Sequence, residues 1–257
     1  MSADARSRLA AASIEGTPEE VWQQWFATPS GQLAELDVMT PRRVVVAGAH
    51  PDDEVLGAGG LMAAMAARGV PVTVVCMSDG AGSHPGSPTY TPPELGALRH
   101  HELIDAAGVL GVTDVRWTGL PDGGLGQCRG RLVEVLTDVV REGPVTATLL
   151  VSVWEHDGHP DHEVVGDASV ETADRCGIPL IRYPIWMWHW ATPGDPALPV
   201  SRLRRLPLSE AHRRAKSSAL RRFRTQIAPL SSHPADRVVL PPAVLARHLR
   251  TTETVVV

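Results

Sequence analysis

Residues 43–54 read RVVVAGAHPDDE, and this stretch decides the fold. Its first six residues form a short, mostly β-branched apolar run, which predicts a buried strand of a parallel sheet. The polar residues from His50 to Glu54 follow at once, and a glycine-rich segment that we expect to be helical begins at Gly57. A strand, a polar loop and a helix in this order form the basic unit of an α/β fold.

The same alternation continues downstream. We expect further strands near 70–77, 114–117, 147–154 and 180–186, and helices over 57–68, 93–110, 129–141 and 162–176. Glycines stand where each of these four helices should end, at 69, 111, 143 and 177. The pattern predicts a Rossmann-like, three-layer fold with helices on both faces of a mainly parallel sheet. Numbered along the chain, its five strands should lie in the order 3-2-1-4-5.

The rest of the chain divides around this core. We expect one domain over residues 1–257, with a helical N-terminal extension at 1–40, the α/β core at 41–190 and a C-terminal region at 191–257. In the extension, Thr17 should cap a helix that has proline at its first position, and the aromatic residues after it should dock on the sheet. Residues 83–93 read SHPGSPTYTPP and predict a long loop.

Composition excludes several classes of protein. The chain has 24 basic and 29 acidic residues, for a net charge of -5, which argues against general nucleic-acid binding. It has no apolar run long enough to span a membrane, and its first thirty residues lack the apolar core of a secretory signal. We therefore expect a cytoplasmic protein with neither nucleic acid nor membrane as partner.

The number and spacing of the cysteines argue against a disulfide framework. The three cysteines, Cys76, Cys128 and Cys176, lie far apart without any Cys-x-x-Cys spacing. We expect them to be small buried residues.

A second polar stretch, HDGHPDH at residues 156–162, follows the fourth expected strand. The carboxyl ends of parallel strands meet at one edge of a sheet, and in the expected order strands 1 and 4 are neighbours, so the two polar loops should face each other. Two histidines and a carboxylate form an open metal site of the catalytic kind, with a position left for water.

The adjacent carboxylates Asp52 and Asp53 suit a division of labour. Neighbouring side chains point in different directions, so one can bind the metal while the other removes a proton from water. A nearby imidazolium can stabilise the oxyanion or protonate the leaving amine. These residue types alone do not choose between His159 and His162 as the second histidine ligand.

A single His-Pro-Asp turn is commonly a plain turn that caps the next helix. Here two such loops stand at strand ends and carry four of the eleven histidines, which favours chemistry over capping.

At AHPDDE and GHPDH the sequence resembles the zinc-dependent N-acetylglucosaminide deacetylases of the phosphatidylinositol-glycan class L, or LmbE-like, family. The resemblance covers about residues 42–226. It implies that Zn²⁺, or Fe²⁺ in its place, is held by His50, Asp53 and His162, with Asp52 as general base. It also implies that His159 is the electrostatic and acid partner.

Three further positions follow from the resemblance. Asp161 would orient an imidazole from behind. Arg99 and Asp122 stand at places that resemble the family's sugar-binding positions, although a solvated helix arginine and a turn aspartate would look the same. Some family members carry a tyrosine where this chain has Asp157. The oxyanion would then rely either on Tyr90, reaching in from the 83–93 loop, or on zinc and His159.

We expect the protein to hydrolyse the N-acetyl amide of a small amino-sugar conjugate and to release acetate and a free amine. A single deacetylase domain with its catalytic core at 41–190 would carry out this reaction. One alternative is an amidase or deacylase that acts on a larger glycoside, such as a mycothiol conjugate or an antibiotic. Two others are an Fe(II) oxygenase with the same ligands and a non-enzymatic, metal-containing sugar-binding protein.

Two other features allow two readings each. Trp186, Trp188 and Trp190 alternate as in a strand and could form a sugar platform, although packing explains them equally well. Residues 201–224 carry eight arginines and one lysine and could attract a phosphate-bearing partner, but a solvated face of a helix around 209–226 is the simpler reading.

Overall fold

The computed structural model describes residues 2–13, 15–37 and 40–257. The strands are β1 (Ala34–Glu35), β2 (Arg43–Gly48), β3 (Val72–Ser78), β4 (Asp114–Leu120), β5 (Thr148–Val153), β6 (Leu180–Tyr183), β7 (Leu203–Pro207) and β8 (Thr252–Val256). The helices are α1 (Ser2–Ala11), α2 (Glu19–Phe26), α3 (Asp53–Ala67), α4 (Pro92–Val109), α5 (Arg129–Arg141), α6 (Pro160–Cys176), α7 (Met187–Trp190), α8 (Glu210–Leu220), α9 (Arg224–Ile227) and α10 (Pro242–Ala246). No helix in these ranges is both long and apolar enough to cross a membrane.

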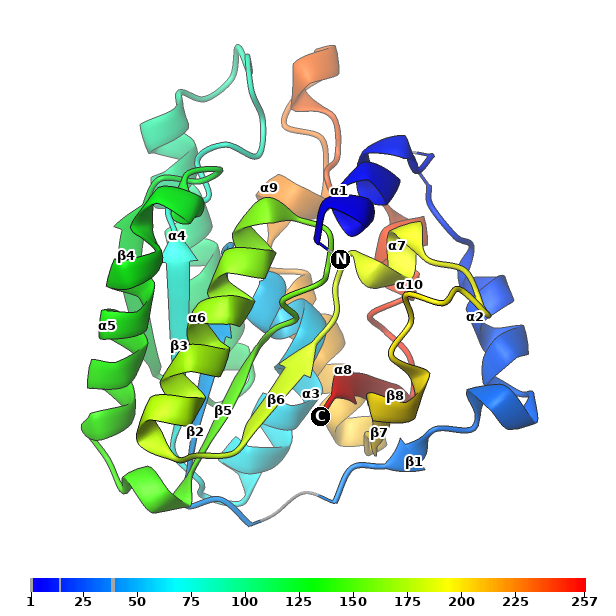
Figure 1. Cartoon of the computed structure of the whole chain (residues 1–257). Helices are drawn as coiled ribbons and strands as arrows, with labels where there is room; N and C mark the ends of the chain where they lie inside the picture. Colours follow the sequence, from blue (N-terminus) through cyan, green and yellow to red (C-terminus); the bar gives the residue numbers. More distant parts are fainter. Residues whose placement is uncertain (1, 14, 38–39) are drawn as a thin grey trace.

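An eight-stranded sheet in the order β1-β7-β8-β6-β5-β2-β3-β4 forms the centre of the fold, with helices on both faces (Figure 1). Helices α5 and α6 cover one face, and α3, α4 and α8 cover the other. Val46 of β2 pairs in parallel with Val74 of β3 and with Val151 of β5. These three strands are completely buried, as their apolar sequences predict.

The predicted order of the five core strands appears within this sheet as β4-β3-β2-β5-β6, but the prediction was incomplete. Strands β8, β7 and β1 extend the sheet beyond β6, and β8 runs antiparallel to β6 and β7. The physical reason lies in their sequences. Strand β1 has only two residues, and β7 is an arginine-rich strand, so neither carries the apolar run by which the core strands were predicted.

Strand β2 is the point at which the order of the sheet reverses. The chain proceeds from β2 to β3 and β4 on one side and then crosses to β5 and β6 on the other. The carboxyl ends of β2 and β5 therefore flank the crevice in which open α/β sheets bind ligands. Both polar loops predicted from the sequence begin here.

Several expected helix boundaries were wrong. Helix α3 begins at Asp53 rather than at 57, inside the first polar motif, and α6 begins at Pro160, two residues before the expected start at 162. Pro18, not Thr17, is the residue before α2, and the Thr17 hydroxyl donates to the Ala191 carbonyl instead of capping the helix. The expected helix at 209–226 is divided into α8 and α9.

The tryptophan-rich stretch is a helix, not the expected end of a strand. Trp188 and Trp190 are buried in a second apolar cluster together with Trp22 and Trp25 of α2. Trp22 meets Trp188 edge to face with ring centroids 5.0 Å apart, and its indole N–H donates to the Trp188 carbonyl. The packing interpretation is therefore confirmed for these indoles, which hold the N-terminal extension against α7 and the β7–β8 edge.

All three cysteines are free thiols, in agreement with their spacing. Cys76 is buried as predicted, whereas Cys128 and Cys176 are only partly buried. The expectation of complete burial was wrong for these two.

Candidate metal centre and active site

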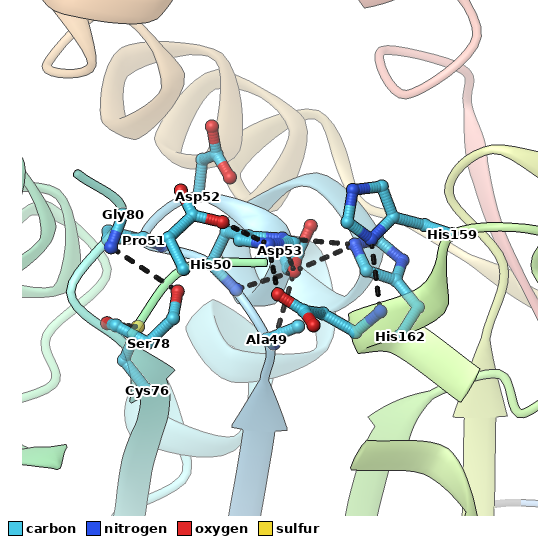
Figure 2. Close-up of polar contacts among 12 residues, drawn as sticks. Ala49, His50, Pro51, Asp52, Asp53, Cys76, Ser78, Gly80, His159 and His162 are labelled. Atoms are coloured by element: carbon cyan, nitrogen blue, oxygen red, sulfur yellow. Dashed lines mark hydrogen bonds and ion pairs between the residues drawn. The ribbon is translucent and has the colours of Figure 1, made fainter. Parts of the chain in front are cut away.

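A pocket of about 150 Å³ lies at the carboxyl ends of β2 and β5. Six of the eight residues singled out from the sequence line it: His50, Asp52, Asp53, Arg99, Asp122 and His159. His162 projects from α6 toward His50 and Asp53 (Figure 2). Oδ2 of Asp161 lies 3.4 Å from Nε2 of His50. Residues from the 226–240 segment, Gln226, Val239 and Leu240, complete the pocket, and no sequence motif indicated them.

Three donor atoms converge on one point beside this pocket. Nδ1 of His50 lies 3.2 Å from Nε2 of His162, and Oδ2 of Asp53 lies 3.4 Å and 3.2 Å from these two nitrogens (Figure 2). A tetrahedral zinc site with bonds of about 2.0 to 2.1 Å has ligand-to-ligand edges of about 3.3 to 3.4 Å. The triangle therefore has the dimensions of one face of such a site.

In both His50 and His162, the ring nitrogen that does not face the donor triangle lies near a carboxylate. Nδ1 of His162 lies 2.8 Å from Asp157, and Nε2 of His50 lies 3.1 Å from Asp122 and 3.4 Å from Asp161. When one ring nitrogen donates to a carboxylate, the other presents its lone pair, as metal-binding histidines require. The donor set and its support thus fit a divalent metal.

Sequence reasoning missed Asp157, which it treated only as a departure from the family pattern. Its position could have indicated this role, because Asp157 is a carboxylate in the loop after β5 and lies five residues before the candidate ligand His162. Asp161 does contact an imidazole, that of His50, and it also accepts the backbone N–H groups of Gly123 and Leu125.

The carboxylates around the triangle favour protonated imidazoles in the metal-free protein, so a metal that binds here must displace a proton from each ring. Burial opposes charge on His50 and His162, but the carboxylates around them outweigh it. The pKa of His50 is raised well above its ordinary value, and that of His162 to about 9. Burial would raise the pKa of Asp53, yet the two imidazoles hold it well below its usual range. Asp53 is therefore ionised throughout the physiological range.

Asp52 occupies a different environment and points away from Asp53 (Figure 2). Its carboxylate lies 3.2 Å from the Arg99 guanidinium. Burial and the charge of Asp53 raise the pKa of Asp52 to about 7, against the lowering effect of Arg99. A carboxylate with a pKa near 7 suits a general base.

His159 caps α6, because its Nδ1 accepts the backbone N–H of Asp161 at 3.2 Å. Burial and the neighbouring His162 and His50 lower the pKa of His159 to about 3. The imidazole is therefore neutral and carries its proton on Nε2. Its ring centroid lies 4.8 Å from those of His50 and His162, and donor atoms of all three rings lie within 4.8 Å of one another.

Arg99 and Asp122 both have protein partners. Arg99 is buried and donates to the Gly80 carbonyl as well as to Asp52. Gly80 has φ +63, and a Cβ there would lie 2.8 Å from Arg99, so glycine is needed for this approach. Asp122 contacts His50 and accepts the Gly82 N–H. Sugar binding by Arg99 and Asp122 stays a prediction.

Neither tyrosine lines the pocket within the ranges that the structure describes. Tyr90 is exposed on the 83–93 loop, and Tyr183 is buried with its hydroxyl donating to the Ala47 carbonyl. Of the two side chains that the sequence left open for contact with the oxyanion, His159 lines the pocket and Tyr90 does not.

Both polar motifs lie within a region that matches a known protein family. The family profile described as PIG-L, GlcNAc-PI de-N-acetylase, matches residues 45–173, which is half of the chain. A probable N-acetyl-alpha-D-glucosaminyl L-malate deacetylase 2 of Bacillus anthracis is 35% identical over 134 residues, which covers 51% of this chain and 58% of the relative. A diacetylchitobiose deacetylase of Thermococcus kodakarensis is 29% identical over 140 residues, covering 54% and 51%.

Among solved structures, the A40926 pseudoaglycone deacetylase Dbv21 shares the fold. It has a TM-score of 0.64 and 23% identity, over 84% of this chain and 96% of that one. The chain spans about three fifths of the length of the curated malate deacetylase relatives that it matches. Because the family profile covers both polar motifs and half of the sequence, the chain belongs to the PIG-L, or LmbE-like, deacetylase family.

Proposed function

We propose that this protein is a metal-dependent N-deacetylase that hydrolyses the N-acetyl amide of an amino-sugar conjugate and releases acetate and a free amine. One observation carries the proposal. The donor triangle of His50, Asp53 and His162 stands beside a separate carboxylate, Asp52, whose pKa is near 7. The names of the relatives, which are deacetylases of N-acetylated sugars, support an amide as the bond that is broken.

We assign the metal to His50, Asp53 and His162, and zinc is the ion that this donor set suits, with iron as the alternative. When bound, such an ion would supply a Lewis acid that polarises the acyl carbonyl and makes water more acidic. Asp122, Asp161 and Asp157 would keep the two imidazoles in the orientation that ligation needs.

Asp52 removes the proton of the attacking water in this mechanism. Arg99 holds the Asp52 carboxylate in place, and the burial of both side chains excludes bulk water from the proton transfer. General-base catalysis of this kind contributes about 10² to 10⁴-fold in rate.

His159 donates its Nε2 proton in a hydrogen bond to the carbonyl oxygen as negative charge develops there. The resemblance implies that His159 is the acid, but a neutral imidazole with a pKa of about 3 has no additional proton to give at neutral pH. Asp52 has just gained a proton from water. We therefore assign to Asp52 the return of that proton to the leaving amine, and to His159 the stabilisation of the oxyanion.

The test is amine release from a panel of N-acetylglucosaminides, including an inositol conjugate and simple glycosides, by protein of known metal content. Chelation and Asp52→Asn should each abolish release, with the metal still bound in Asp52→Asn. The matched control is Asp138→Asn, because Asp138 is exposed on α5 and does not line the pocket. Release that survives chelation would contradict the metal dependence of the reaction. Metal-loaded protein that acts on no member of the panel would contradict the proposal and favour a sugar-binding protein.

A further inference from the structure

A small cavity of about 20 Å³ adjoins the catalytic pocket, and Leu56 of α3 lines both. It lies where α3, α8 and the segment 247–254 meet, and Figure 1 shows these two helices and β8 side by side. A space of about 10 to 15 Å³ is enough for one water molecule. The cavity can therefore hold a single small ion or water, but no organic molecule.

Buried positive charge lines this cavity. Lys216, Arg247 and Arg250 all contribute to it, with exposed fractions of 2%, 3% and 8%. Glu253 lies 2.7 Å from Lys216. Glu19 accepts two hydrogen bonds from Arg250, at 2.8 and 2.6 Å. In the part of the chain that the structure describes, no other carboxylate forms an ion pair with these cations, so one positive charge is left without a counter-charge.

Arg247 is the cation that has no carboxylate partner among the described residues. Its guanidinium donates to the carbonyls of Thr17 and Glu15 and to Nδ1 of His189, all of them neutral acceptors. These bonds leave other N–H groups of the guanidinium for a further acceptor, since an arginine has five. Burial and the nearby Arg250 lower the pKa of Arg247 to about 10, so its surroundings disfavour the charge. A buried charge needs a partner, and an anion would supply it.

A hydroxyl without a partner lies at the same cavity. Thr254 lines it and is 8% exposed, and its buried Oγ1 has no hydrogen-bond partner among the described residues. A buried hydroxyl left unsatisfied is unfavourable, so an acceptor in the cavity would stabilise it. His248 also lines the cavity, but burial and the charge of Lys216 lower its pKa well below the ordinary value, so the ring is neutral. The cavity thus combines hydrogen-bond donors with an excess of positive charge, as an anion site requires.

We propose that this cavity binds one monovalent anion of the size of chloride, held by Arg247, Lys216 and the Thr254 hydroxyl. The anion supplies the missing negative charge, which a water molecule cannot do. The cavity shares Arg250, Thr252 and Thr254 with a larger pocket of about 520 Å³, through which the ion can enter. Amide hydrolysis involves none of these residues, so the site is independent of the proposed function.

The bound anion should make stability depend on chloride. Urea unfolding is measured on chelated protein at constant ionic strength, with chloride replacing gluconate, an anion too large for the cavity. An ion that binds only the folded protein lowers the equilibrium constant for unfolding about tenfold for each tenfold rise in its concentration above Kd. Chelation keeps a metal ion from contributing to this effect. An unfolding constant that is the same in both salts would overturn the proposal and leave water as the occupant of the cavity.

Two threonines provide a matched pair of variants. Thr137 on α5 is 7% exposed, its Oγ1 also lacks a partner among the described residues, and it does not line the cavity. Valine keeps the shape of threonine, so Thr254→Val and Thr137→Val should both fold. Thr254→Val should raise the Kd for chloride by about tenfold or more, because it removes a hydrogen bond to a charged group, and Thr137→Val should leave this Kd unchanged. Equal Kd values in the two variants would overturn the proposal.

A crystal structure with bromide locates the ion directly. Bromide resembles chloride and scatters X-rays anomalously, so crystals grown in bromide should show an anomalous peak in the cavity beside Arg247 and Lys216. The absence of this peak, at a bromide concentration that stabilises the protein in solution, would overturn the proposal. Neither measurement needs a substrate. A protein that binds the anion but hydrolyses no amide would uphold the anion site and overturn the proposed function, and a deacetylase whose stability is independent of chloride would do the reverse.

Discussion

The Asp157 carboxylate lies 2.8 Å from Nδ1 of His162, and both side chains are fully buried. The same carboxylate accepts the backbone N–H groups of Ile185, Trp186 and Met187, each at 2.9 Å. One side chain therefore fixes a candidate metal ligand on α6 and also the backbone where α7 begins. The orientation of the ligand and the path of the chain after β6 depend on the same group.

Asp157→Asn should weaken metal binding by about 10- to 100-fold, because an amide cannot accept all four of these hydrogen bonds and no longer stabilises the His162 N–H. The measurement is metal affinity by competition with a chelator. Asp174→Asn, an exposed change on α6, serves as the control and should have no effect. Unchanged affinity in Asp157→Asn would show that His162 is not a ligand or needs no such support.

Arg99→Gln should shift the pH dependence of the reaction. Arg99 lies 3.2 Å from Asp52 and lowers the pKa of that carboxyl, so its removal raises the pKa further. A general base acts when deprotonated, so the rising limb of kcat/KM against pH should move to higher pH. Arg131→Gln, an exposed change on α5, should leave the profile in place. A limb that does not move would exclude Asp52 as the base.

Because of the Asp236 carboxylate, the free energy of unfolding should decrease as the pH falls into the acid range. Burial alone would raise its pKa, but the hydroxyls of Ser231, Ser87 and Thr89 outweigh this effect and lower the pKa to about 2. A group whose pKa is depressed on folding contributes stability above its unfolded pKa, about 3.9, and loses it as the pH falls toward the folded value.

The comparison is the urea midpoint of the native protein with that of Asp236→Asn at pH 7 and at several values between pH 4 and pH 2. The native protein should be more stable at pH 7, and the difference should shrink across the acid window. A difference that stays constant with pH would mean that the charge of Asp236 contributes nothing.

Lys216 and Glu253 form a buried ion pair with Nζ and Oε1 2.7 Å apart, and Glu253 also accepts the N–H groups of Gly60 and Leu61 in α3. Lys216→Met should cost about 3 to 5 kcal/mol in the free energy of unfolding, since it leaves a carboxylate buried without its cation. The double variant Lys216→Met/Glu253→Gln should lose less than the sum of the single changes in urea titrations. Strict additivity would show that the pair is not coupled.

The sequence predicted the site better than it predicted the edges of the fold, and the reason is physical. The core strands are buried on both faces, so their apolar runs could be recognised, and a loop at the end of such a strand has a known place in the sheet. Strand β7 follows no such pattern, and the turn to α7 depends on Asp157, a contact across 28 residues that no local pattern reveals.

The same limit explains the wall of the catalytic pocket that Gln226, Val239 and Leu240 form. These residues lie beyond both motifs in the sequence, and only tertiary structure brings them to the pocket. The motif residues could be assigned because the chemistry requires particular side chains. A wall that requires only a suitable shape leaves no comparable pattern in the sequence.

The residue types alone did not decide whether His159 or His162 is the second histidine ligand. Substituting each of the two residues in turn distinguishes their roles. His162→Gln should abolish stoichiometric metal binding, because Nε2 of His162 is one corner of the donor triangle. His159→Gln should keep the metal and lower kcat by about 10² to 10³, the usual cost of removing one hydrogen-bond donor from a developing oxyanion. Metal content by elemental analysis and kcat at saturating substrate distinguish the two. Loss of metal in His159→Gln with retention in His162→Gln would exchange the roles assigned to these residues.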